Sequence, residues 1–179
     1  SSRPLLTRTE MDLPESGGAL VVVGSHVPRT NGQLTHLLRQ RGILGIEVNS
    51  NDLLSRTRSS ERIGSVAQQA DQALRVGKDV VIFTAREIVT GTSAEDSLTI
   101  ARHISEGVVA IVSAIESKPR YILAKGGNTA SDIATKALNV KRAMVPGQAS
   151  PGVPVWQLGP ESRHPGLRYI VFPGNVGGP

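Results

Sequence analysis

The stretch Tyr121-Ile-Leu-Ala-Lys125-Gly126-Gly127-Asn128-Thr129-Ala-Ser131-Asp132 decides how the rest of the chain is interpreted. A short apolar run ends in Lys-Gly-Gly, small polar residues follow, and an amphipathic run begins at Ile133. This order is typical of a strand, a tight glycine turn and the first turn of a helix. Adjacent glycines permit positive φ values and a close approach of backbone N–H groups to a ligand. Taken alone, the stretch is about equally consistent with two interpretations. One is a phosphate-binding turn at a helix N-terminus, and the other is a plain βα turn with no ligand.

Strand-like and helix-like segments alternate on both sides of this turn. Strands are predicted at residues 19–23, 43–48, 79–83, 120–124, 142–145, 153–158 and 168–172, and helices at residues 30–41, 60–76, 94–117 and 129–138. Residues 49–52 look like a polar break, and the cap-forming side chains of Asn128, Thr129 and Ser131 indicate where the last helix begins. The last two strands look like a hairpin at a sheet edge. The pattern predicts a Rossmann-like, mostly parallel α/β sheet flanked by helices, with a short hairpin near the C-terminus.

The domain organisation follows from composition along the chain. Residues 1–18 are polar and contain Pro4, Pro14 and two glycines, so we interpret them as a linker or N-terminal arm. Residues 19–179 then form one domain. Because the chain starts at Ser1 and stops in a glycine-rich turn, we expect it to be a piece of a longer protein.

Composition excludes several classes of protein. Of 179 residues, 39% are hydrophobic and only 3% are aromatic, and the net charge of +5 is dispersed, which argues against a base-stacking nucleic-acid platform. Cysteine is absent, so there is no disulfide framework. The sequence has neither an apolar run of membrane-spanning length nor a signal-peptide pattern. A cytoplasmic location, with no membrane partner, is the expectation that follows.

Three glycine-marked turns follow predicted strands: Gly24-Ser25, Gly126 to Thr129, and Pro173-Gly174-Asn175. Parallel sheets bind ligands beyond the carboxyl ends of their strands. If the three strands are neighbours, these turns meet at one edge of the sheet. That convergence is a stronger indication of a binding site than any single turn.

Familiar catalytic and metal-binding motifs are missing. There is neither a GxxxxGK[ST] phosphate loop nor a GxGxxG fingerprint, and the histidines lack metal-ligand spacing. His26 lies in a glycine turn, where a surface role is favoured over a ligand contact, and Ser25 lacks the glycine of a nucleophile elbow. Lys125 could meet a phosphate as a point charge or end its strand in solvent. The sequence therefore predicts no metal ligands and leaves the catalytic base unknown.

An ordered set of short motifs resembles a known family. The motifs are Val23-Gly24-Ser25 with Thr30 and Gln33, Lys125-Gly126-Gly127-Asn128-Thr129, Gly147-Gln-Ala-Ser-Pro151-Gly152-Val153-Pro154, Phe172-Pro173-Gly174-Asn175-Val-Gly177, and Val155-Trp156 followed by Leu158-Gly159-Pro160-Glu161-Ser162. From about Leu20 to its end, the chain is similar to the C-terminal, nucleotide-binding domain of the four-carbon acid sugar kinase family. Each piece is weak alone, but their order is specific.

The resemblance implies a carbohydrate kinase, that is, a transferase with ATP and Mg²⁺ as cofactors. Such kinases phosphorylate threonate, erythronate or 3-oxo-tetronate acids, and an N-terminal domain absent from this chain would hold most of the sugar acid. By motif, Ser25 would contact the nucleotide, Gly126, Gly127, Asn128 and Thr129 would wrap its phosphates, and Gly174 would line the adenosine side. Many members carry Asp or Glu where this chain has Asn128, so a carboxylate role there is lost. The isolated domain is expected to be inactive.

A second interpretation comes from a different class. Because no general base or metal cluster is visible, the chain could be a non-catalytic α/β module that binds a phosphorylated metabolite or a partner protein. Nucleotide selectivity discriminates the two hypotheses. The sequence is also compatible with a homodimer.

Overall fold

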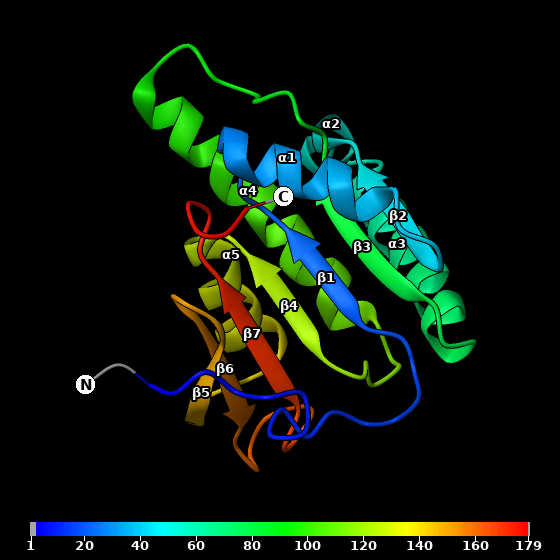
Figure 1. The fold of residues 1–179 in the computed structure, drawn as a ribbon. Helices are drawn as coiled ribbons and strands as arrows, with labels where there is room; N and C mark the ends of the chain where they lie inside the picture. Colours follow the sequence, from blue (N-terminus) through cyan, green and yellow to red (C-terminus); the bar gives the residue numbers. More distant parts are fainter. Residues whose placement is uncertain (1–2, 179) are drawn as a thin grey trace.

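The structure is a computed structural model that describes residues 3–178 (Figure 1). The helices are α1 (Pro28–Leu38), α2 (Ser50–Leu54), α3 (Ser59–Arg75), α4 (Ala94–Ala114), α5 (Gly127–Asp132) and the π-helical turn η1 (Ile133–Ala137). The strands are β1 (Leu20–Val23), β2 (Ile43–Val48), β3 (Asp79–Thr84), β4 (Ile122–Lys125), β5 (Ala143–Ser150), β6 (Val153–Leu158) and β7 (Arg168–Phe172).

The strands form one seven-stranded sheet in the order β2-β3-β1-β4-β7-β6-β5. Strands β2, β3, β1, β4 and β7 run parallel to one another, whereas β6 is antiparallel to both β7 and β5. The prediction of a mostly parallel α/β sheet with a hairpin near the C-terminus is therefore confirmed. Because β1, β4 and β7 are adjacent and parallel, their carboxyl ends lie at one edge of the sheet (Figure 1).

The hairpin lies elsewhere in the sheet than the sequence predicted. Strands β6 and β7 pair as expected, but β7 lies inside the sheet, where it also pairs with β4. The edge is formed by β5, which extends to Ser150 and has two irregularities in its register with β6. A buried β7 is consistent with Tyr169 and Ile170, which are 0% and 5% exposed. The spacing of strands in the sequence does not reveal their order in the sheet.

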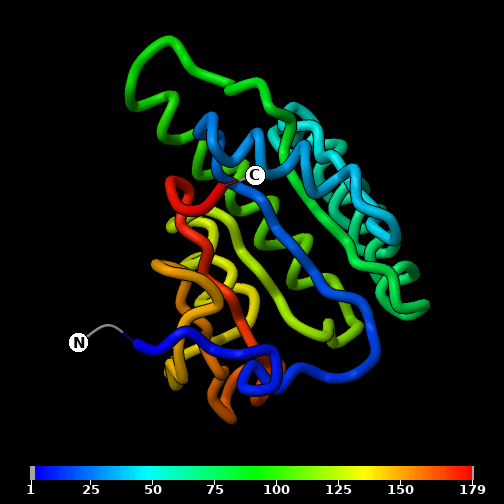
Figure 2. Tube along the Cα trace, viewed as in Figure 1, coloured from blue at the N-terminus to red at the C-terminus, as the bar shows by residue number. Residues whose placement is uncertain are grey.

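The sheet is covered differently on its two faces. Helices α3, α4, α5 and η1 pack on one face, over a core that includes Leu20, Val22 and Ile122 (Figure 1). The other face is covered by α1 at one side and by the N-terminal arm at the other (Figure 2). The arm is tied down where the Leu6 N–H donates to the Gln148 carbonyl over 2.8 Å. The middle of this second face, over β1, β4 and β7, lies between α1 and the N-terminal arm.

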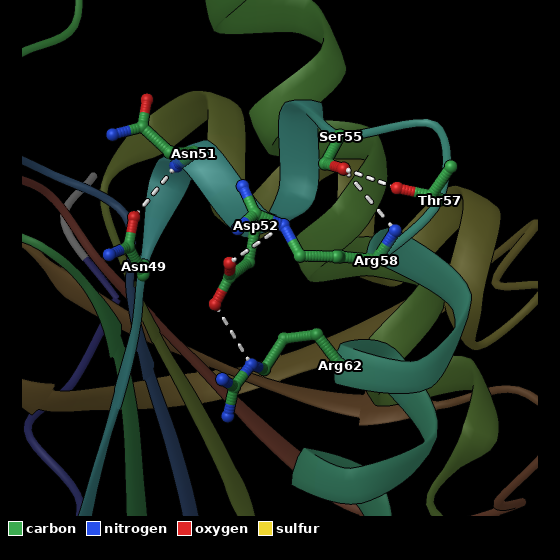
Figure 3. Close-up of polar contacts among 7 residues, drawn as sticks. All are labelled: Asn49, Asn51, Asp52, Ser55, Thr57, Arg58 and Arg62. Carbon is green, nitrogen blue, oxygen red and sulfur yellow. Dashed lines mark hydrogen bonds and ion pairs between the residues drawn. The ribbon is translucent and has the colours of Figure 1, made fainter.

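Polar side chains determine where several helices begin and end. Helix α2 begins within the predicted polar break at 49–52, and its first turn is capped by Asn49 (Figure 3). Arg62 anchors this short helix to α3 by a 3.1 Å contact with Asp52. Helix α4 ends at Ala114, earlier than expected, and the buried carboxylate of Asp71 accepts the N–H groups of Glu116 and Ser117 just beyond it. Hydrogen-bonding partners far away in the sequence thus set the end of this helix.

Candidate functional site

A small hollow lies where β1, β4 and β7 end. It encloses about 210 Å³ and is lined by Gly24, Ser25, Gly126, Gly127, Asn128, Thr129 and Gly174. All six residues that the sequence suggested for nucleotide contact therefore line the same space, together with Gly24. The three loops follow neighbouring strands, which is the condition under which the sequence predicted that the three glycine turns would meet.

The turn after β4 supplies the backbone wall of the hollow. Gly126 is the N-cap of α5 and has a φ of +113°, a value that L-residues rarely adopt. The first helical hydrogen bond runs from the Ala130 N–H to the Gly126 carbonyl over 2.9 Å, so the N–H groups of residues 127–129 have no acceptor within the helix. Three backbone donors at the positive end of a helix suit an oxyanion.

The two glycines of this turn have different roles. Gly127 has an ordinary helical backbone, so the expectation of positive φ applies to Gly126 only. A Cβ added at Gly127 would meet no atom within 4 Å, because it would project into open space. Gly126 is thus required by the conformation of the turn, and Gly127 leaves room beside it.

The predicted helix cap is wrong. Helix α5 begins two residues earlier than expected, with Gly126 as its N-cap, so neither Asn128, Thr129 nor Ser131 serves as the cap. Thr129 instead packs against β1, since a Cβ on Gly24 would lie 1.9 Å from its Oγ1. Asn128 is exposed on the rim of the hollow. Glycine at position 24 therefore allows the end of β1 and helix α5 to approach closely.

The Ser25 turn is held by two side chains, those of Thr30 and Arg86. The Thr30 hydroxyl lies 3.0 Å from Ser25 Oγ and 3.1 Å from the Gly174 carbonyl, and so bridges the turns after β1 and β7. Thr30 was expected to cap α1, but it is buried inside the first turn, where Val27 precedes the helix. The guanidinium of Arg86 donates to the Ser25 carbonyl over 2.8 Å. Burial lowers the pKa of Arg86 below its ordinary value.

The loop after β7 is fastened by long polar side chains of α1. Gln33 Nε2 donates to the carbonyls of Val176 and Gly178, each over 3.0 Å, and Arg29 donates to that of Gly177 over 3.2 Å. Lys125 also reaches this loop and is 4% exposed. The lysine therefore neither lines the hollow nor ends its strand in solvent, the two alternatives that the sequence left open.

A second cavity, of about 170 Å³, adjoins the hollow through the shared residues Gly24 and Thr129. Its walls include apolar side chains of α4, of the loop after β3 and of η1, with polar groups from β3 and the Ser25 turn. His26 lies in this wall, 3.2 Å from the Ala85 carbonyl.

Asp132, the acid nearest to the turn after β4, is already paired. Asp132 accepts the Ser105 hydroxyl over 2.9 Å and pairs with Lys136 over 3.2 Å. Within residues 3–178 there is no cluster of three His, Cys, Asp or Glu residues suited to a metal ion.

Comparisons with known proteins place the chain among nucleotide-binding domains. A family model described as a nucleotide-binding C-terminal domain matches residues 20–179. No curated protein is similar to the chain. Across residues 3–178, none of the helices combines the length and apolar character needed to span a bilayer.

Solved structures share the fold. One is a domain of unknown function (DUF1537) from Bordetella bronchiseptica, with bound citrate in a domain-swapped dimer, at a TM-score of 0.72, 21% identity and 92% coverage of this chain. A Haemophilus influenzae protein of the same family has a TM-score of 0.68 and 16% identity over 93% of this chain. A Salmonella typhimurium LT2 protein that is provisionally named a tRNA synthase has a TM-score of 0.65 and 23% identity over 93% of this chain. The chain spans 39% of the length of each of these proteins.

Proposed function

This chain belongs to the nucleotide-binding C-terminal domains of the four-carbon acid sugar kinase family, and from that premise we propose that it binds the ATP of a sugar acid kinase. The observation that carries the proposal is the hollow in which three glycine turns meet. The proposed substrates are four-carbon acids such as threonate, erythronate or their 3-oxo forms. Because the chain spans 39% of the relatives' length, we assign most of the sugar acid site to a domain outside it.

The proposed mechanism uses backbone donors. A kinase aligns the attacking and leaving oxygens and neutralises charge on the transferred phosphoryl group. The N–H groups of residues 127–129 would donate to phosphate oxygens, and Ser25 would hold the nucleotide from the side of β1. Gly174 would lie beside the adenosine portion. Mg²⁺ would add positive charge on the phosphates, and the base for the sugar hydroxyl would come from the other domain.

Calorimetric titration of the chain with ADP and ATP in the presence of Mg²⁺ tests the proposal. We expect saturable binding of both nucleotides and weaker binding of AMP, because phosphate oxygens make the principal contacts. Preference for a sugar phosphate over ATP would favour the non-catalytic module instead. Binding of none of these ligands at about millimolar concentration would overturn the proposal.

Turnover gives a separate test of the division between domains. With ATP, Mg²⁺ and a panel of four-carbon sugar acids, we expect no release of ADP that depends on the acid. Substrate-dependent turnover would show that this chain holds the whole active site. Sedimentation of the same samples tests whether the chain forms a homodimer.

A further inference from the structure

Lys125 ends β4, yet its side chain lies on the face of the sheet opposite to α4. It lines a cavity of about 280 Å³ between α1 and the middle strands, with apolar walls that include Leu123 and Phe172. Only 4% of the residue is exposed. An ammonium group in such surroundings requires partners, since an unpaired buried charge is strongly destabilising.

The partners of Lys125 all belong to the end of β7 and the loop after it. Nζ donates to the Pro173 carbonyl over 2.7 Å and to the Val176 carbonyl over 3.3 Å. It also lies 4.0 Å from the centre of the Phe172 ring, within the range of a cation–π contact. The two carbonyls flank Gly174 and Asn175, so a single amine fixes both sides of the third glycine turn.

We propose that Lys125 is a positioning residue for the nucleotide, which holds Gly174 at the hollow and makes nucleotide affinity depend on the charge of a side chain that the nucleotide does not touch. This inference rests on the proposed function. It differs from the sequence interpretation of Lys125 as a phosphate contact, because the lysine lines a different cavity from the hollow.

The charge of Lys125 changes within an accessible pH range. Burial, with a smaller contribution from Arg29, lowers the pKa of Lys125 to about 8. The ionisable groups facing it are Arg29 and His36 on α1 and Tyr121 on β4, whereas residues 173–178 carry none. Burial raises the pKa of Tyr121, so its phenol stays protonated through this range. Loss of the lysine proton weakens two charge-assisted hydrogen bonds and removes the cation–π contact.

The test compares Lys125→Met with the wild-type chain and with Lys78→Met, which removes an exposed charge next to the amino end of β3. ADP affinity, with Mg²⁺, is measured by calorimetry at about pH 7 and about pH 9, above the ordinary range of histidine. We expect Lys125→Met to weaken binding about tenfold at the lower pH. The wild type and Lys78→Met should lose affinity as the pH rises, and Lys125→Met should not.

Two results would overturn the inference: equal ADP affinity of Lys125→Met and the wild type, or a wild-type affinity that does not change with pH. The change of wild-type ADP affinity with pH tests the inference even if Lys125→Met fails to fold. Hydrogen exchange of the backbone N–H groups of residues 174–178 without nucleotide tests, separately from the proposed function, whether Lys125 holds this loop in place. Faster exchange in Lys125→Met than in the wild type supports this role of Lys125, and unchanged exchange contradicts it. If the wild-type chain binds no nucleotide at all, the proposed function is wrong, and so is the role of Lys125 in nucleotide binding.

Discussion

The turn after β4 and the loop after β7 both place a glycine at the same hollow, but they are held in different ways. The first is shaped by its own backbone, through the positive φ of Gly126 and the helix that follows. The second is held by side chains from elsewhere, namely Thr30, Gln33 and Lys125. A locally shaped turn can be inferred from a short sequence, whereas a loop fastened from a distance requires the structure.

Gly127→Val should give the largest effect on the backbone-shaped turn. The new side chain would project into open space beside the N–H groups of residues 127–129 and exclude a phosphate there. We expect ATP affinity to fall on the order of a hundredfold, with little change in melting temperature. Gly64→Val in α3 is the matched control, because its Cβ also meets no atom within 4 Å. Normal ATP binding by Gly127→Val would make the turn purely structural.

Thr30→Val should give the next largest effect, on the loop fastened by side chains. The substitution keeps the shape of a residue that is 1% exposed but removes the hydroxyl near Gly174 and Ser25. We expect about tenfold weaker ATP binding and a loss of about 1–2 kcal/mol in the free energy of unfolding. Thr35→Val, an exposed threonine on the same helix, should change neither quantity. A Thr30→Val chain that binds ATP normally would show that the loop does not need this bridge.

The stability of the wild-type chain relative to Lys125→Met should depend on pH. The folded-state pKa of about 8 lies below the ordinary lysine value, so the folded chain releases this proton first. The free energy of unfolding of the wild type, minus that of Lys125→Met, should therefore rise between about pH 8 and about pH 10. Urea unfolding of both proteins at the two pH values measures the difference. A difference that falls with pH would contradict the lowered pKa.

Asn128→Ala should give the smallest effect. The side chain is exposed at the rim and is not the cap of α5, so we expect the free energy of unfolding to change by less than about 0.5 kcal/mol. ATP affinity should stay within about twofold, because the backbone N–H and not the amide side chain makes the proposed contact. A larger loss of affinity at unchanged stability would show that the Asn128 side chain contacts the ligand, and the backbone mechanism would then be wrong.

The sequence predicted features that depend on neighbouring residues. Buried strands such as β1 and β3 are continuous apolar runs, and glycines mark the ends of β1 and β4, so the fold class and the residues around the hollow could be named. It could not predict the place of β7 inside the sheet, because strand order depends on long-range pairing. Nor could it predict the buried position of Lys125, since a charged residue at a strand end usually faces water.

The internal position of β7 also affects how this domain can be synthesised. While a ribosome makes the chain, β4 emerges well before its partner β7, and β5 and β6 lie between them in the sequence. Until β7 is released, one edge of β4 has no partner within the domain and can pair with other nascent chains. Gly174, which lines the proposed nucleotide site, appears only with this strand, so under that proposal a partly synthesised chain could not use nucleotide to stabilise its folding. Chaperone protection of the β4 edge should therefore matter most in the interval before β7 leaves the ribosome.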